Sequence, residues 1–494
     1  MKKRIILLLL FCTLSASAQI KLPLEVNNYD SLTSYHQLIH FIDQIEPSPK
    51  IKTEVIGKSP GGYDIPALLI SNDEFGKDES KIRVLIFAQQ HGNEPSGKEG
   101  ALMLLKNIYE GELDTLFNKI ELAIIPQLNP DGAEKEERRN SNIEDLNRNH
   151  LTLSQPETEA LHKFFNNYLF EVTLDVHEYY PYDGEWQEFG YIKNFDEQIG
   201  AATNPNVAFE IREMQNKEAL PFIKKYLSER DFTFNNYILE GPPNKSRMRH
   251  STVDINDGRQ SFAILNSLSF IMEGLNGKDR LADNIKRRAE GQTAGMKALL
   301  EYSYKNINEI IKTVNRARAK LKHSRAGEEV AIRMEHIKGN DTLTLNLRSL
   351  YSDGDSLITV IEYHSVVAPI LTVNKPAAYL IPKVDSLLVK WMNKHKIEYK
   401  NYVPDDRQII KVYYVSITDS IVLEGVPIPN IKAEKKDFAD MYPREGYYFV
   451  PINQLHSNLL VLALEPQSMI GLVTYKEYKY LLKGNSYPIL RVEN

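Results

Sequence analysis

Short apolar runs that alternate with helical patterns place the tightest limit on how this chain can fold. Such runs span residues 81–90 (KIRVLIFAQQ), 120–127 (IELAIIPQ), 171–177 (EVTLDVH) and 267–273 (SLSFIME). A run that is apolar almost throughout is typical of a strand buried on both faces of a sheet. Segments with helical periodicity lie between these runs, at residues 96–109 and 156–168. The alternation predicts an α/β fold with a mostly parallel sheet covered by helices.

The pattern changes after Gly327. Residues 280–323 are rich in helix-forming side chains, whereas short alternating runs predict strands at residues 341–347, 357–363 and 409–417. A chain of 494 residues is also longer than one typical domain. We therefore expect a signal peptide at residues 1–18, an α/β domain at 19–326 and a smaller β-rich C-terminal domain of unknown role at 327–494.

The start of the chain predicts export. Residues 2–4 are basic, residues 5–14 are apolar and residues 16–18 (Ala-Ser-Ala) are small, which is the order of a secretory signal peptide. The apolar run has about 10 residues, whereas a membrane-spanning helix needs roughly 20. We expect cleavage before Gln19, a periplasmic or extracellular mature protein, and no transmembrane segment in the mature chain.

Composition limits the chemistry that is available. Cys12 is the only cysteine and lies inside the predicted signal peptide, so the mature chain would have neither disulfides nor thiolate ligands. Any metal site must then use His and carboxylate side chains. The chain has 60 Lys and Arg against 66 Asp and Glu, without a dense basic run in the mature part. This balance does not favour nucleic acid as a partner.

Ionisable residues follow several of the predicted strands. His91 and Glu94 (HGNE) come directly after the strand that ends at Gln90, His177 ends the run EVTLDVH, and Glu273 ends the run SLSFIME. Ligands of open α/β sheets bind at the carboxyl ends of strands. Two imidazoles and one carboxylate form the ligand set of a catalytic zinc site. Glu273 is then the candidate general base for a water molecule that the metal activates.

The spacing HxxE occurs often by chance, and its context gives it meaning. Residues 126–150 read PQLNPDGAEKEERRNSNIEDLNRNH, with HGNEPSG upstream and TLDVHE downstream. In order and spacing this series closely resembles the motifs of the zinc carboxypeptidase (metallocarboxypeptidase) family. The resemblance covers roughly residues 50–300, and the region after about 330 lies outside it.

The resemblance implies a central mixed, mostly parallel sheet between helices, and a zinc metallopeptidase of the carboxypeptidase type with one zinc ion per chain. It gives His91, Glu94 and His177 as the metal ligands. It also implies that Arg138 polarises the scissile carbonyl, and that Asn147 and Arg148 bind the terminal carboxylate of the substrate. A planar guanidinium matches a carboxylate in a bidentate manner, which agrees with the role of Arg148.

The chain departs from the digestive members of this family at two places. Asn93 stands where those members have an arginine, and no tyrosine lies about 22 residues before Glu273, where Ser251 and His250 are found. These departures weaken the inference of classical carboxypeptidase specificity. If Arg148 binds a carboxylate, we expect the substrate to be either a peptide or an acylated amino acid. The leading hypothesis is a metallocarboxypeptidase. The alternatives are a zinc amidase or deacylase acting on N-acyl amino acids or cell-wall peptides, and a non-catalytic binding protein.

Overall fold

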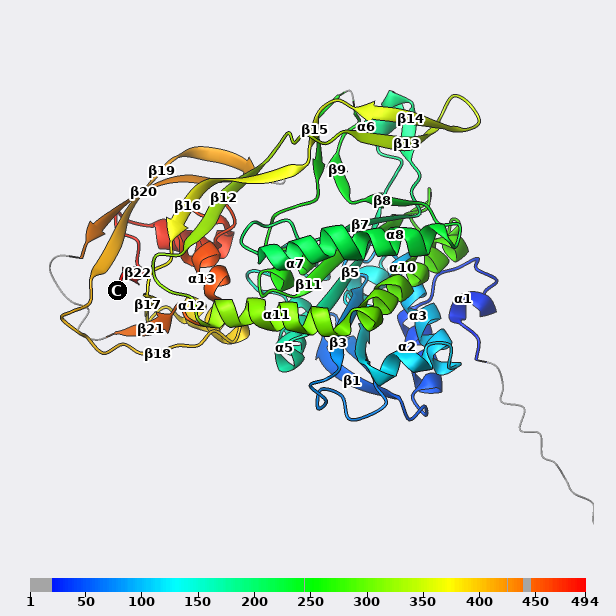
Figure 1. The fold of residues 1–494 in the computed structure, drawn as a ribbon, viewed down its shortest axis with the longest axis horizontal. Coiled ribbons are helices and arrows are strands. Elements are labelled where there is room, and N and C mark those ends of the chain that lie inside the picture. The colour runs from blue at the N-terminus through cyan, green and yellow to red at the C-terminus, as the bar shows by residue number, and fades with distance from the viewer. Residues whose placement is uncertain (1–19, 244, 424, 439–445) are drawn as a thin grey trace, which may run out of the picture.

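The central feature of the computed structural model is a mixed sheet of eight strands (Figure 1). The structure describes residues 20–243, 245–423, 425–438 and 446–494. The predicted signal peptide, residues 1–18, lies outside these described residues. In spatial order, the strands of the sheet are β1 (Ile51–Lys58), β2 (Asp64–Ile70), β4 (Ile120–Ile125), β3 (Ile82–Ala88), β5 (Val172–Tyr179), β11 (Leu268–Leu275), β7 (Glu197–Gly200) and β8 (Phe234–Asn236).

Helices cover both faces of this sheet, as the alternating pattern predicts. On one face Gly97 of α3 packs against Val176 and Ala88 without room for a larger residue. On the other face, the Phe262 ring of α9 stacks on Phe165 of α5, with centroids 4.3 Å apart. The helices of this region are α1 (Pro23–Val26), α2 (Tyr35–Ile45), α3 (Ser96–Tyr109), α4 (Pro130–Glu134), α5 (Pro156–Tyr168), α6 (Gly184–Phe189), α7 (Phe209–Met214), α8 (Leu220–Ser228), α9 (Gly258–Ala263), α10 (Ile285–Lys305) and α11 (Ile307–Lys322).

The four apolar runs are the inner strands β3, β4, β5 and β11, so the predicted α/β fold class is confirmed. Strands β4, β3, β5 and β11 run parallel to one another. The helical segment predicted at 280–323 is two helices, because the helical geometry is interrupted at Asn306 between α10 and α11. Residues 179–258 contain strands β6 (Tyr191–Lys193), β9 (Ile238–Glu240) and β10 (Met248–His250), as well as β7 and β8.

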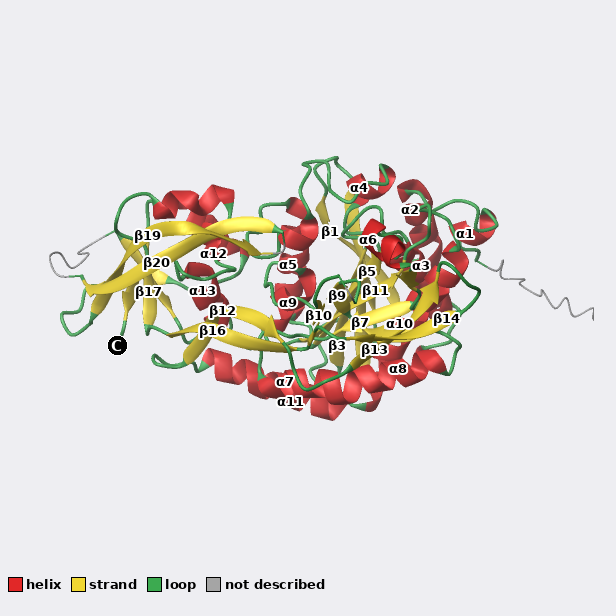
Figure 2. Ribbon diagram, turned by 90° about the horizontal axis from the view of Figure 1, so that it is seen from above, coloured by secondary structure: helices red, strands yellow, loops and turns green. Residues whose placement is uncertain are grey.

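The region after Gly327 is rich in strands, as expected. Figure 2 shows most of it as a second lobe beside the α/β lobe. Its largest sheet has six strands, in the order β18-β21-β17-β22-β19-β20. Its elements are β12 (Glu329–Ile337), β13 (Leu343–Ser349), β14 (Asp355–Val360), β15 (Tyr363–His364), β16 (Val366–Asn374), β17 (Ala378–Pro382), α12 (Ser386–Lys394), β18 (Lys400–Asn401), β19 (Ile410–Leu423), β20 (Val426–Asp437), β21 (Tyr447–Pro451), α13 (Ser457–Leu464) and β22 (Leu490–Val492).

This region is joined closely to the α/β lobe. The antiparallel strand pair β12–β16 extends from the second lobe toward β13 and β14, which lie beyond the β7–β8 edge of the large sheet (Figure 1). There β13 pairs with β6, and β15 pairs with β10. A second connection joins α12 to the loop before α5, where the Trp391 indole Nε1 donates a hydrogen bond to the Leu151 carbonyl at 2.8 Å. The division predicted at residues 326 and 327 therefore separates sheets that share one hydrophobic core, and it remains a prediction.

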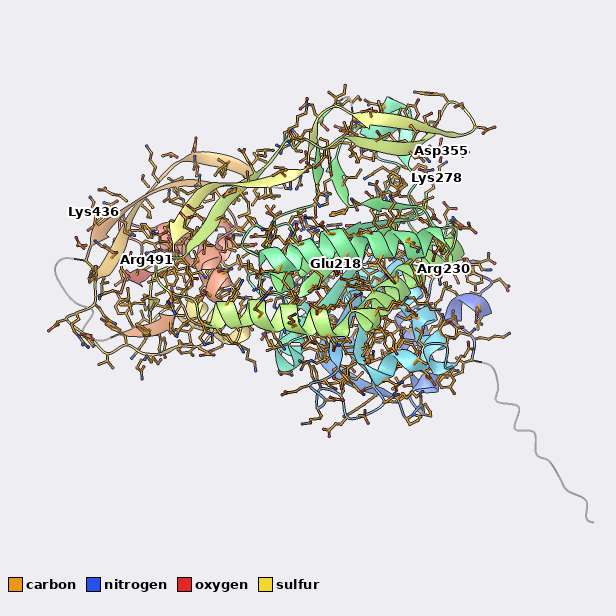
Figure 3. The ribbon with its side chains drawn as sticks, in the orientation of Figure 1. Glu218, Arg230, Lys278, Asp355, Lys436 and Arg491 are labelled. Atoms are coloured by element: carbon orange, nitrogen blue, oxygen red, sulfur yellow. The ribbon has the colours of Figure 1, made fainter. Side chains whose placement is uncertain are left out.

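The second lobe also has its own buried ion pair. Arg491 of β22 lies inside this lobe (Figure 3), where its guanidinium contacts the Glu465 carboxylate. The Tyr379 hydroxyl donates to the same carboxylate at 2.6 Å.

Among the residues that the structure describes, the helices lack the combination of length and apolar character that crossing a bilayer requires.

Four buried histidines lie where α5 meets the second lobe: His150, His162, His395 and His456. His150 Nδ1 lies 3.0 Å from His162 Nε2, and His395 Nε2 contacts the Leu151 carbonyl at 2.8 Å. Burial lowers the pKa of His150 and of His395 to about 4, and that of His456 to about 3. The cluster is therefore neutral in the folded protein at pH 7.

We expect these histidines to make the folded protein sensitive to acid. Their pKa values are lower in the folded chain than the ordinary value near 6.5, so the unfolded chain binds more protons below that pH. Stability is then constant above about pH 6.5 and declines as the pH falls toward about 4. Replacing His456 with Leu should reduce the pH dependence of the unfolding free energy by about 1.4 kcal/mol per pH unit in this window.

Denaturant melts at several pH values between 4.5 and 7.5 measure this slope. The control is His40→Leu, which removes an exposed histidine of α2 and should leave the slope unchanged. An equal slope in the His456→Leu variant and the wild type would show that His456 does not contribute.

Candidate active site

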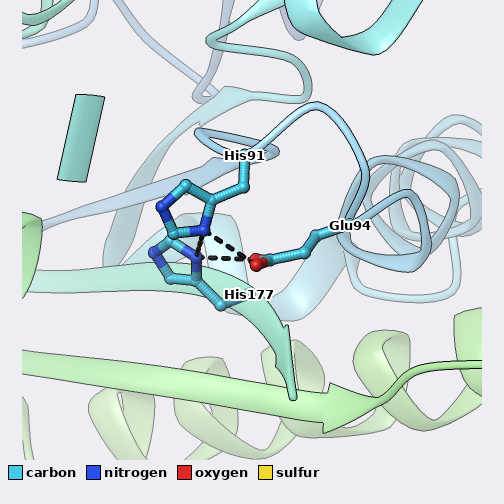
Figure 4. Close-up of side chains that lie close together, drawn as sticks. All are labelled: His91, Glu94 and His177. Carbon is cyan, nitrogen blue, oxygen red and sulfur yellow. Dashed lines mark hydrogen bonds and ion pairs between the residues drawn. The ribbon is translucent and has the colours of Figure 1, made fainter. Parts of the chain in front are cut away.

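Three side chains converge at the carboxyl ends of β3 and β5 (Figure 4). His91 follows β3, Glu94 lies in the loop before α3, and His177 is in β5. The His91 Nδ1 atom lies 2.8 Å from Glu94 Oε1, and the His177 Nδ1 atom lies 2.9 Å from Glu94 Oε2. The two Nδ1 atoms are 3.1 Å apart. All three side chains are buried, so the structure brings the sequence-predicted ligands together as a compact set of two nitrogens and one carboxylate.

A carboxylate holds the second ring nitrogen of each histidine. His91 Nε2 lies 3.1 Å from Asp145 Oδ1, and His177 Nε2 lies 2.8 Å from Asp175 Oδ1. Such contacts fix the orientation of an imidazole and raise its basicity, and they commonly accompany histidines that ligate a metal. The Nδ1 atoms of both rings are thereby directed toward Glu94, which fits a metal ion at the point of convergence.

The electrostatics of this cluster favour positive charge. Burial alone raises the pKa of Glu94, but His91 and His177 outweigh it and hold that pKa well below its ordinary value. Burial lowers the pKa of His177, yet the contacts with Asp175 and Glu94 raise it well above its usual range. The acidic surroundings thus stabilise a cation. A zinc ion supplies such a charge and displaces the protons of its ligands.

Glu273 lies directly beside His177, because the two residues are partners in the parallel pairing of β11 with β5. Paired residues on neighbouring strands project from the same face of a sheet. Burial raises the pKa of the Glu273 carboxyl to about 7, while His177 lowers it and Glu94 raises it. A carboxylate with a pKa near neutrality is suited to accept a proton and to release it again.

Arg138 and Arg148 approach the cluster from one loop region. Arg138 Nη1 lies 3.3 Å from Glu94 Oε1, and Arg138 Nε donates to Asp145 Oδ2 at 3.1 Å. Arg148 ends the short 3₁₀ helix Leu146–Arg148 and donates from Nη1 to the Asn147 carbonyl at 2.7 Å. Asn147 Nδ2 lies 3.2 Å from His177 Nε2. The structure therefore places Arg138, predicted to polarise the carbonyl, beside Glu94, and Asn147 beside His177, with Arg148 next to Asn147.

Sequence reasoning missed several contacts of this site. Gln90 Nε2 donates to Asp175 Oδ1 at 2.7 Å, and Gln90 Oε1 lies 2.8 Å from His150 Nε2, so this glutamine connects the site to the histidine cluster. Tyr237 interacts electrostatically with Glu273 and Arg148, although it lies far from the position searched for a tyrosine. Asp145 contacts the ligand His91. Its place just before Asn147 and Arg148 in the motif DLNRN was the sequence feature that could have indicated a position in the site.

Glu178 is structural, as its position after a ligand on a strand indicates. Its carboxylate pairs with the Arg288 guanidinium, with Oε1 2.6 Å from Nη2, and accepts a hydrogen bond from the Ser96 backbone N–H at 3.0 Å. Glu178 thereby ties β5 to the start of α3 and to α10. Its side chain turns away from the face that carries His177 and Glu273.

The comparisons with known proteins agree with this geometry. The family description "Zinc carboxypeptidase" matches residues 38–187. The carboxypeptidase 2 of Trichophyton rubrum is 25% identical over 456 residues, which cover 88% of this chain and 82% of that protein. This likeness extends beyond Gly327 into the second lobe.

Solved structures that resemble the chain include a metallo-carboxypeptidase from Burkholderia cenocepacia, at 18% identity and a TM-score of 0.43 over 55% of this chain and 69% of that one. Another is the carboxypeptidase A of Helicoverpa armigera, at 17% identity and a TM-score of 0.43 over 57% and 75%.

The matched segment contains all three candidate ligands as well as Arg138, Asn147 and Arg148, whereas Glu273 lies outside it. The cluster of two histidines and one glutamate is a candidate metal site and fits a metal-dependent hydrolase. Residues 38–187 match the zinc carboxypeptidase family, and with the carboxypeptidase relatives and the candidate metal site this match supports a zinc metallopeptidase of the carboxypeptidase type that binds one zinc ion.

Proposed function

We propose that this protein is an exported metallocarboxypeptidase that removes the last residue of a peptide, with Glu273 as its general base. The observation that carries the proposal is the position of Glu273, which is paired in register with His177 at the edge of the Glu94 cluster. One zinc ion held by His91, Glu94 and His177 would supply the Lewis acidity that polarises a carbonyl group and acidifies water. Glu273 then accepts the proton of the attacking water and passes it to the leaving amine.

Arg138 stabilises the negative charge that develops on the carbonyl oxygen. Its guanidinium is held at the metal cluster by Glu94 and Asp145, so the cation is already in place before the substrate arrives. A preorganised cation at such a position contributes more than a flexible one because it needs no reorganisation during the reaction.

Arg148 and Asn147 select a substrate with a free terminal carboxylate. A guanidinium offers two parallel N–H donors to a carboxylate. Arg148 lies next to Asn147, and Asn147 in turn lies beside His177. A substrate whose terminal carboxylate binds to Arg148 and Asn147 would therefore present its last peptide bond to the metal site. Export through residues 1–18 to the periplasm or the outside of the cell completes the proposal, and it rests on the sequence pattern.

The test uses the zinc-loaded mature protein and pairs of peptides that differ only in a C-terminal carboxylate or amide. We expect single-residue trimming of the free acid, and kcat/KM lower by about 100-fold or more for the amide, because two charge-assisted contacts are lost. The Arg148→Met variant should reduce this discrimination. Arg139→Met, which removes a neighbouring arginine bonded to the Ile143 carbonyl, should not.

Two outcomes contradict the proposal. If the peptides with a C-terminal carboxylate and a C-terminal amide are cleaved equally well, Arg148 does not bind the terminal carboxylate. Turnover of N-acyl amino acids without any peptide trimming would identify an amidase or deacylase instead.

A further inference from the structure

Lys193 is a cation that has aromatic neighbours and, within the described part of the chain, no ion pair with a carboxylate. It is the last residue of β6, and its backbone pairs with Leu347 of β13 from the region after Gly327. Its Nζ atom lies 4.9 Å from the centre of the Tyr179 ring and 5.5 Å from that of Trp186. Lys193 is partly buried, and among the described residues its ammonium group forms neither a hydrogen bond nor an ion pair.

This arrangement is costly unless a ligand uses it. An ammonium group removed from water loses much of its hydration, and contacts with aromatic rings restore only part of that free energy. Burial lowers the pKa of Lys193 to about 8, while Glu273 and Asp183 raise it. Lys193 therefore remains largely protonated at pH 7, close enough to the general base for the two charges to interact.

The strand β5 shows on which side of the metal cluster Lys193 lies. Asp175, His177 and Tyr179 alternate along β5 and project from one face. Asn147 is at the Asp175 end, because its Oδ1 accepts a hydrogen bond from Gly258 N–H at 2.8 Å and Gly258 lies against the Asp175 carboxylate. Lys193 covers Tyr179, at the opposite end. The carboxylate-binding pair and Lys193 thus lie on opposite sides of His177.

A bound peptide would extend along this line. With its terminal carboxylate at Arg148 and Asn147 and its scissile carbonyl at the metal cluster, its preceding residues run toward Tyr179. Two residues of β5 correspond to about 7 Å, which is about the length of two extended peptide residues. The first or second residue before the scissile bond therefore reaches Lys193.

We propose that Lys193, between Tyr179 and Trp186, forms a subsite for an anionic group on the acyl side of the scissile bond. Asp or Glu at one of the two residues before the bond is the expected ligand. The inference rests on the proposed carboxypeptidase function and specifies its substrate class. The region after Gly327 contributes to this subsite, because β13 holds β6 in place.

The experiment compares peptides that carry either Glu or Gln at the first or second residue before the scissile bond, with the same C-terminal residue. For the wild type we expect kcat/KM to be about tenfold higher with Glu, because a charge-assisted contact replaces hydration. Lys193→Met should bring the Glu-to-Gln ratio close to one. Lys193→Arg should retain the preference, and high ionic strength should weaken it.

Lys245→Met is the matched control. Lys245 is an exposed lysine that pairs with Glu188 of the nearby helix α6, so the variant removes one positive charge from the same part of the surface. A ratio of two rate constants is insensitive to a general loss of folded protein.

Two results overturn this proposal alone, provided that the protein trims peptides: the wild type shows no preference for Glu, or the Lys193→Met variant keeps that preference. If the zinc-loaded wild type trims none of these peptides, the proposed function itself fails, and this inference fails with it.

Discussion

Replacing Glu273 with Gln is expected to lower kcat by about 1,000-fold, while the protein still binds one zinc ion per chain. A positioned general base contributes between about 100-fold and 10,000-fold. Glutamine has almost the same shape but cannot accept the proton of the attacking water. Glu273 is not one of the three converging ligands, so the metal should remain bound. Peptide trimming assays and zinc content measured on the same preparation check both parts.

Glu197→Gln is the matched control for this variant. Glu197 is a buried glutamate on the adjacent strand β7, and its partner in the pairing with β11 is Gly274. Burial raises the pKa of Glu197 well above its ordinary value, so a neutral amide is a conservative replacement there. Its carboxyl group faces Gly291 of α10, away from His177. This variant should keep kcat within about threefold of the wild type, because glutamine replaces a carboxyl group that is already neutral.

A Glu273→Gln variant that retains a tenth or more of the wild-type kcat would exclude Glu273 as the base. A variant that loses zinc would instead assign it a role in holding the metal site together.

The inner part of the fold could be predicted because its strands are buried on both faces. Residues 82–88 and 120–125 are apolar nearly throughout, and such runs have few alternatives to a central strand. The strand β1 was missed for the opposite reason. It lies at the edge of the sheet, and its sequence IKTEVIGK has polar residues at exposed positions, so the pattern resembles a loop.

The candidate site was predictable to the extent that it is contained in local motifs. His91 and Glu94 are three residues apart, and the structure brings them together with the distant His177 and Glu273 as the strand-end argument predicts. Lys193 has no such local signal. Its environment depends on Tyr179, on Trp186 and on a strand more than 150 residues later. A single lysine in a three-residue strand carries no pattern that could reveal this.

The second large effect is expected from His177→Ala, which should abolish both zinc binding and peptide trimming. Catalytic zinc sites use three protein ligands, and the loss of one leaves too few contacts to hold the ion. Zinc added to metal-free wild-type protein should raise Tm, because a ligand that binds only the folded state stabilises it by about 4 kcal/mol at 1,000 times its Kd. The same addition should leave the Tm of His177→Ala unchanged. This readout does not depend on activity.

The control is His40→Ala, because His40 is an exposed histidine of α2 and its loss should affect neither zinc content nor the zinc-induced rise in Tm. The alanine at position 177 also removes the imidazole partner of Asp175, which then keeps its hydrogen bond from Gln90, so the metal-free variant should melt at a lower temperature than metal-free wild type. A His177→Ala protein that binds one zinc ion as tightly as the wild type would show that the metal lies elsewhere. The convergence of His91, Glu94 and His177 would then be a structural cluster, and the base proposed at Glu273 would have no metal beside it.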